Sequence, residues 1–189
     1  MPKFTGHSLF TLRSILLNMN KKVKFIAYGA LVAALYCAIS LALLPMAFAQ
    51  VQFRPAEALM VLSIFFPFAP AGLFIGCFIT NLFSPYGILD VICGSSATLL
   101  AAVLIYLFSK KIENIVYRCI VCPFIAVIVN ATIIGAVIYA TQTPEAQAYS
   151  FFFFFWEIFL SEAVSVYLIG VPLIIFCQKN HLKINKLLS

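Results

Sequence analysis

Four stretches of this sequence are almost entirely apolar over about twenty residues or more: 25–44, 88–108, 119–140 and 151–177. A hydrocarbon core about 30 Å thick needs about 20 helical residues at 1.5 Å per residue. The chain is 64% hydrophobic and only 10% charged, so it lacks the polar surface of a soluble protein. These features exclude a soluble enzyme, a disordered chain and a secreted disulfide scaffold, and they predict an all-α integral membrane protein.

The stretch 55–84 is also apolar, but Pro67 and Pro70 interrupt it. Proline lacks the amide donor and clashes with the preceding helical turn, so this stretch forms either one broken span or a hairpin of two short spans. Positive charge marks the cytoplasmic side of a membrane protein. Only the hairpin returns the basic clusters at 110–118 and 179–186 to the side of the first cluster, 21–24. We therefore predict six transmembrane helices with the N and C termini in the cytoplasm.

The remaining features fit one membrane domain. We expect residues 1–19 to form a cytoplasmic N-terminal extension and residues 20–189 the membrane domain. The small-x-small sequence 47–49 resembles a signal-peptide cleavage site, but the apolar run before it is longer than the usual 7–15 residues, so we expect no cleavage. The formal net charge of +6 sits at span edges, where it faces anionic lipid headgroups rather than nucleic acid. The six cysteines lie in apolar runs and form no metal motif.

Polar residues inside the predicted spans gather in their outer halves. Glu162 lies roughly 17 Å deep, at 1.5 Å per residue, where an ionised group costs about 2.5–3.5 kcal/mol. This distribution indicates an externally open polar cavity in a helix bundle. The candidate ligand-binding residues are Gln52, Arg54, Glu57, Asn81, Tyr86, Asp90, Asn130, Trp156 and Glu162.

Several of these candidates have simpler explanations that the sequence leaves open. Arg54 and Glu57 are spaced i,i+3 and could form a local ion pair. Asp90 could cap a helix, Trp156 could anchor at the headgroups, and Asn130 could join two helices.

Charge constrains the ligand of such a cavity. Four outer-half carboxylates, including Glu157, face the single cation Arg54. A carboxylate accepts two parallel N–H bonds, so the cavity should prefer a neutral or cationic solute that is rich in N–H donors.

The chain shows no source of energy for transport. It has no G-x-x-x-x-G-K-[ST] loop for ATP and no matching inverted halves. Small residues four apart on the first span allow another helix to approach closely, either within the chain or from a partner. These candidate partner-contact residues are Gly29, Ala30, Ala33, Ala34 and Ala38.

Several motifs resemble the QueT family over residues 20–178. They are Val-Gln-Phe-Arg-Pro-Ala-Glu-Ala-Leu at 51–59, Gly-Leu-Phe-Ile-Gly-Cys at 72–77, Asn-Leu-Phe-Ser-Pro-Tyr-Gly-Ile-Leu-Asp-Val at 81–91, and Ser-Glu-Ala at 161–163. Ser161 stands where the family pattern has glycine.

The resemblance implies the bundle of a substrate-binding S component of an energy-coupling factor (ECF) transporter in the bacterial plasma membrane. Such a subunit captures queuosine precursors, which are 7-deazaguanine bases, without a cofactor. It docks through its first helix onto a transmembrane T component that carries two ATPases, and toppling in the membrane then releases the ligand inward.

We expect Glu162 or Asp90 to bind the guanine-like N–H edge and Glu57 to bind the amine substituent. Asn81, Gln52 and Asn130 would satisfy the other ring atoms, Tyr86, Trp156 or Phe53 would stack on the base, and residues 45–54 would form a lid. Two alternatives remain: an S component for a different vitamin, and an intramembrane enzyme that uses Asp90 and Glu162 as an acid/base pair. No span contains histidine and no catalytic motif surrounds these carboxylates, so we predict no enzymatic activity.

Overall fold

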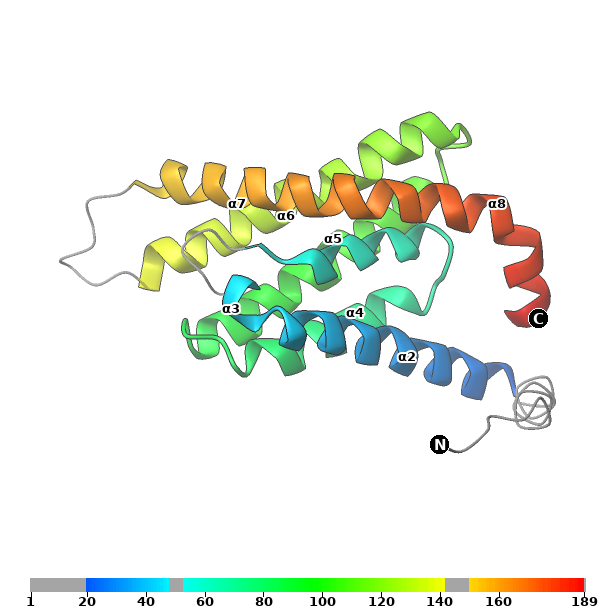
Figure 1. Ribbon diagram of the computed structural model, residues 1–189, viewed down its shortest axis with the longest axis horizontal. Helices are drawn as coiled ribbons and strands as arrows, with labels where there is room; N and C mark the ends of the chain where they lie inside the picture. The colour runs from blue at the N-terminus through cyan, green and yellow to red at the C-terminus, as the bar shows by residue number, and fades with distance from the viewer. Residues whose placement is uncertain (1–19, 48–52, 142–149, 189) are drawn as a thin grey trace, which may run out of the picture.

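The computed structural model describes residues 20–47, 53–141 and 150–188, and in these ranges the chain is helical without strands (Figure 1). The elements are α2 (Lys21–Ala42), α3 (Leu44–Ala47), η1 (Pro55–Ile64), α4 (Ala69–Asn81), η2 (Asp90–Gly94), α5 (Ser95–Ser109), α6 (Ile115–Thr141), α7 (Phe151–Ser165), η4 (Val166–Gly170) and α8 (Val171–Leu188). The segment η1 is a 3₁₀ helix, whereas η2 and η4 are π-helical turns.

Four helical segments are long and apolar enough to cross a membrane: Lys21–Ala42, Asp90–Ser109, Ile115–Thr141 and Phe151–Asn180. Two further apolar helices, Pro55–Ile64 and Ala69–Asn81, are shorter. The prediction of an all-α membrane bundle is therefore confirmed for the described residues. The count of six spans and the cytoplasmic position of the termini stay predictions.

The chain reverses direction between successive segments of the bundle (Figure 1). The start of α2, the turn between η1 and α4, and the connection between α5 and α6 lie toward one end of the molecule. This connection holds Lys110 and Lys111, and α2 begins at Lys21, so basic residues gather at that end. The segments η1 and α4 pack on each other as an antiparallel pair, which is the hairpin arrangement that the charge pattern favours.

The short segment η1 occupies the centre of the bundle. It contacts α2, α4, α5, α6, α7, η4 and α8, and Ala56, Met60 and Val61 are fully buried. A 3₁₀ helix of 10 residues is unusual because runs beyond three or four residues are uncommon. Pro55 suits the first turn of this helix, where its missing N–H donor has no partner to lose. Any polar side chain on η1 is thereby brought into the bundle interior.

Glycines bring α2 and α4 into close contact. A Cβ at Gly72 would collide with the backbone oxygen of Gly29, and one at Gly76 would lie 2.8 Å from Tyr36 Cβ. Side chains at these positions would push the helices apart, so the small residues allow the backbones to approach as they do in other membrane helix pairs.

Candidate ligand-binding site

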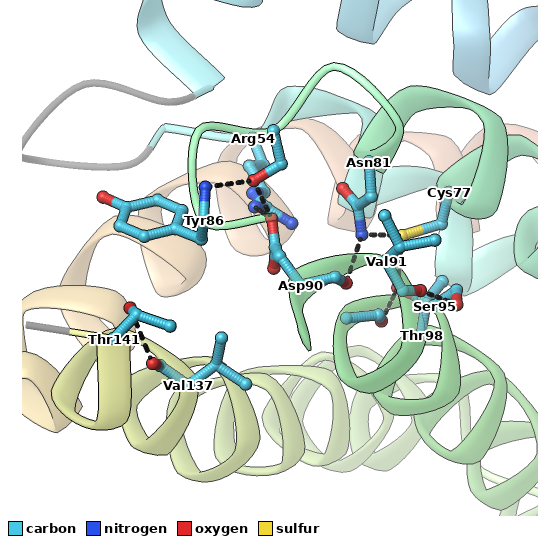
Figure 2. A network of polar contacts seen from close by, with 12 residues as sticks. Arg54, Cys77, Asn81, Tyr86, Asp90, Val91, Ser95, Thr98, Val137 and Thr141 are labelled. Atoms are coloured by element: carbon cyan, nitrogen blue, oxygen red, sulfur yellow. Dashed lines mark hydrogen bonds and ion pairs between the residues drawn. The ribbon is translucent and has the colours of Figure 1, made fainter. Parts of the chain in front are cut away.

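Four charged side chains meet in the interior of the bundle. Arg54, Glu57, Asp90 and Glu162 are all at most 9% exposed. They come from three segments far apart in the sequence: the start of η1, η2 and α7. Arg54 Nη2 lies 3.3 Å from Asp90 Oδ2 (Figure 2). Ser84 Oγ donates a 2.5 Å hydrogen bond to the same oxygen. A buried charge needs a partner, and this ion pair joins the start of η1 to η2.

Glu57 is held by donors from two other helices. The Tyr36 hydroxyl donates to Glu57 Oε1 at 2.6 Å, and Thr98 Oγ1 lies 3.4 Å from Oε1 and 3.5 Å from Oε2. Thr98 Oγ1 also lies 3.3 Å from the Cys77 sulfur. The centre of the bundle therefore contains a carboxylate that α2 and α5 orient.

Asn130 connects the remaining acidic residue to this group. Its amide nitrogen donates a 2.8 Å hydrogen bond to Glu162 Oε1, and the same side chain faces Glu57. Glu57 and Glu162 lie near enough to each other and to Arg54 to interact electrostatically. The buried cluster thus contains three acidic side chains and one arginine, so it has an excess of acidic groups.

Two acceptor atoms in this cluster have no hydrogen-bond partner among the described residues. They are Asp90 Oδ1 and Asn130 Oδ1, and both are buried. Buried polar atoms are almost always paired, and leaving one unpaired costs about 1–3 kcal/mol. Both orphan atoms are acceptors, so a molecule that satisfies them must offer donors.

Asn81 plays a structural part in the arrangement. Its amide nitrogen donates to the Asp90 backbone oxygen at 3.1 Å and lies 3.4 Å from Cys77 Sγ (Figure 2). A Cβ at Gly94 would lie 2.5 Å from this nitrogen and 3.0 Å from Asp90 Oδ1. The glycine in the π-helical turn thus leaves room for both side chains, and π-helical turns are frequent at functional sites.

The structure brings six of the nine predicted ligand-binding residues together. These are Arg54, Glu57, Asn81, Asp90, Asn130 and Glu162. The ion pair of Arg54 runs to Asp90, 36 residues away in sequence, rather than only along its own helix as a local i,i+3 pair with Glu57 would. Asp90 makes this pair from within η2, so its side chain does more than cap a helix.

Two of the other three predicted residues lie in the described part of the chain. The backbone N–H of Tyr86 donates to Ser84 Oγ at 3.2 Å, beside the Asp90 carboxylate (Figure 2), while its half-buried side chain packs against an apolar cluster that includes Ile134 and Ile158. Trp156 is 55% exposed and packs edge-on against Phe155 and Phe159, so the structure does not bring it into the buried cluster and its role in the ligand site stays a prediction. Gln52 lies outside the described residues, as does half of the predicted lid, residues 48–52.

Four contributors to the cluster were not among the predicted residues: Tyr36, Cys77, Ser84 and Thr98. Ser84 lies within the Asn-Leu-Phe-Ser-Pro-Tyr motif, which could have identified it. The others are small or aromatic residues of apolar helices, where such residues are common. Only the packing reveals that Tyr36 and Thr98 contact Glu57 and that the Cys77 sulfur contacts Thr98 and Asn81.

Some of the small residues of α2 are buried against α4, and the others are exposed on the surface of the bundle. Gly29 and Ala33 are buried against α4, whereas Ala30, Ala34 and Ala38 are exposed. An apolar groove of about 410 Å³ runs between α2 and α4. It is lined by Phe25, Ile26, Gly29, Ala30, Ala33, Ala34, Cys37, Phe68, Ala71, Gly72, Ile75 and Ile79. Small residues therefore serve packing within the chain and also form an open surface.

A family model described as "QueT transporter" matches residues 26–179 of the chain. No curated protein and no solved structure matches the chain. The matched range contains every described residue of the buried cluster and every residue that lines the groove except Phe25.

Proposed function

Because the chain belongs to the QueT transporter family, we propose that it is the substrate-binding S component of an ECF-type importer. It captures a queuosine precursor, a 7-deazaguanine base, from outside the cell. The family assignment supports a role in transport across a membrane rather than in catalysis, and the acidic cluster supports the type of solute.

The two unpartnered acceptors are the observation that carries the choice of ligand. Asp90 Oδ1 and Asn130 Oδ1 need donors, and Glu57 and Glu162 add further acceptors beside them. The Watson–Crick edge of a 7-deazaguanine base presents ring and exocyclic N–H donors side by side, which a carboxylate accepts in parallel. A base with a protonated aminomethyl group would also offset the acidic excess of the cluster.

We assign the two ends of the ligand accordingly. Glu162 and Asn130 accept from the guanine-like edge, because their side chains lie next to each other on α6 and α7. Glu57 accepts from the substituent at the other end of the base. Asp90 lies between Arg54 and Ser84 and offers Oδ1 to a ring N–H group.

The groove between α2 and α4 is the proposed contact with the T component. It is apolar and lined by small side chains, which suit the close approach of a helix from a membrane partner. Within this proposal, the ATPases bound to the T component supply the energy for release, and the cell membrane is the site of action.

The test is to purify the protein in detergent and identify any copurified small molecule by mass spectrometry. Titration calorimetry then compares 7-deazaguanine bases with guanine, thiamine, biotin and riboflavin. Tight binding of a deazaguanine, recovered unaltered, supports the proposal. Binding of another vitamin in preference would make the chain an S component of different specificity, and chemical conversion of the bound molecule would indicate an enzyme.

A further inference from the structure

Tyr36 makes the shortest hydrogen bond to the Glu57 carboxylate that the structure records. Its hydroxyl donates to Oε1 at 2.6 Å, whereas Thr98 Oγ1 is 3.4 Å from that oxygen. Tyr36 is 2% exposed and Glu57 is 1% exposed, so water does not compete for this bond. A hydrogen bond to a charged acceptor in such surroundings is stronger than one at a surface.

The bond leaves the two carboxylate oxygens unequal. Oε1 accepts from Tyr36 and contacts Thr98, whereas Oε2 has a longer contact of 3.5 Å with Thr98. A carboxylate offers about four lone-pair sites, so Oε2 retains capacity for a further donor. Tyr36 thereby determines which oxygen of Glu57 is presented to a ligand.

The tyrosine ring is itself held in place by α4. A Cβ at Gly76 would lie 2.8 Å from Tyr36 Cβ and 3.1 Å from Tyr36 Cγ. Because glycine has no Cβ, these two tyrosine atoms pack directly on the α4 backbone. A tyrosine has only two side-chain torsions, and this contact restricts the first of them. The hydroxyl therefore reaches Glu57 from a fixed position.

We propose that Tyr36 is a positioning residue for ligand binding, acting through Glu57 by fixing the orientation of its carboxylate. This inference rests on the proposed function. It also assigns a second role to α2: Ala33 and Cys37 line the groove, while Tyr36 between them reaches the ligand cluster. One hydrogen bond thus joins the helix of the groove to the ligand-binding carboxylate.

The test measures binding of a 7-deazaguanine base to Tyr36→Phe in detergent by calorimetry. The ring remains and only the hydroxyl is lost, so we expect the dissociation constant to rise about tenfold. The matched control is Tyr167→Phe, which removes the 2.8 Å bond to the Ile120 backbone oxygen on an exposed part of the bundle. This control should bind like the wild type.

A double-mutant comparison separates positioning from a general structural effect. In a Glu57→Asp background, the shortened carboxylate lies beyond the reach of the Tyr36 hydroxyl, so Tyr36→Phe should add less than a twofold change. An equal tenfold loss in both backgrounds would overturn the inference. Wild-type protein that binds no deazaguanine would instead overturn the proposed function.

Infrared spectroscopy of the ligand-free protein provides a second measurement. The carboxyl band that disappears in Glu57→Gln should shift in Tyr36→Phe, because the donated hydrogen bond alters the carbon–oxygen stretching frequency. The same band should stay in place in Tyr167→Phe. A band that Tyr36→Phe leaves unmoved would show that the hydroxyl does not act on Glu57 and would overturn the inference without any binding measurement.

Discussion

The amide of Asn130 donates a 2.8 Å hydrogen bond to Glu162 Oε1, which ties α6 to α7, while its own oxygen has no partner among the described residues. One side chain thus completes a protein contact with its nitrogen and leaves its acceptor unused. A helix-to-helix contact alone would not require a buried, unpaired oxygen. The two alternatives for Asn130, a link between helices and a contributor to the ligand site, are therefore compatible.

Glu162→Gln should weaken binding of a 7-deazaguanine base about tenfold to one hundredfold. The neutral amide loses a charge-assisted bond, which is worth about 1.5–3 kcal/mol, while its oxygen can still accept from Asn130. Thermal unfolding in detergent should therefore stay close to that of the wild type. Glu157→Gln is the matched control on the same helix, because Glu157 is only half-buried; equal losses in both variants would remove Glu162 from the site.

Arg54→Gln should destabilise the protein strongly. It leaves Asp90, 1% exposed, as an uncompensated buried charge, which costs about 3–5 kcal/mol. The double variant Arg54→Gln, Asp90→Asn removes both charges and should lose less than the sum of the single variants. Equilibrium unfolding in mixtures of detergent and sodium dodecyl sulfate measures all three, and additive losses would show that the 3.3 Å ion pair contributes nothing to folding.

The sequence predicted the class of the molecule well because membrane insertion leaves a signal in each segment separately. Apolar runs and basic clusters are local features, and they were sufficient for the membrane bundle. The resemblance of the motifs to the QueT family is confirmed by the family match. The positions of the basic clusters favoured a hairpin for the short segments 55–64 and 69–81. In the structure these two segments pack antiparallel, as in a hairpin.

The sequence predicted the side chains of the cluster only where burying them in a membrane has a large energetic cost, which is the case for charged residues. Glu162, Glu57 and Asp90 stand out in apolar sequence because each charge needs a reason to be there. Tyr36 and Thr98 carry no such signal, since either residue can face a neighbouring helix in many ways. Trp156 carries an ambiguous signal, because an aromatic residue near polar ones suggests stacking on a ligand but also suits a surface position. In the structure its ring packs on phenylalanines, and its role in the ligand site stays a prediction.

Gly72→Ala and Gly29→Ala should have opposite effects on stability although both positions lie in the same helix pair. The new methyl group at Gly72 would meet the Gly29 backbone oxygen, so we expect a loss of about 1–3 kcal/mol. The methyl group at Gly29 would lie 3.6 Å from the Phe68 oxygen, an ordinary contact, and alanine favours the helix by about 1 kcal/mol. Unfolding measurements that rank the two variants the other way would contradict the packing of α2 on α4.

Ala34→Trp should abolish uptake while leaving ligand binding unchanged. Ala34 is exposed and lines the groove between α2 and α4, so an indole there would fill the surface that we assign to the T component. Leu35→Trp is the control, because Leu35 is 45% exposed on the same helix but does not line the groove. Uptake of a labelled deazaguanine by cells, together with calorimetry on the purified protein, separates the two steps. Normal uptake by Ala34→Trp would place the partner contact elsewhere.

Cysteine labelling in intact cells should establish the six-span topology. The turn before η2 and the connection between α5 and α6 lie at opposite ends of the bundle (Figure 1), and Pro85 and Glu113 are exposed in these two places. In a variant without the native cysteines, Pro85→Cys should react with a membrane-impermeant maleimide added outside. Glu113→Cys should react only after the cells are permeabilised, because Lys110 and Lys111 beside it favour the cytoplasmic side. The reverse pattern would place the basic end outside, as one broken span over 55–84 or an inverted bundle requires. Reaction of both cysteines from outside would show that Asp90–Ser109, the segment between them, does not cross the membrane.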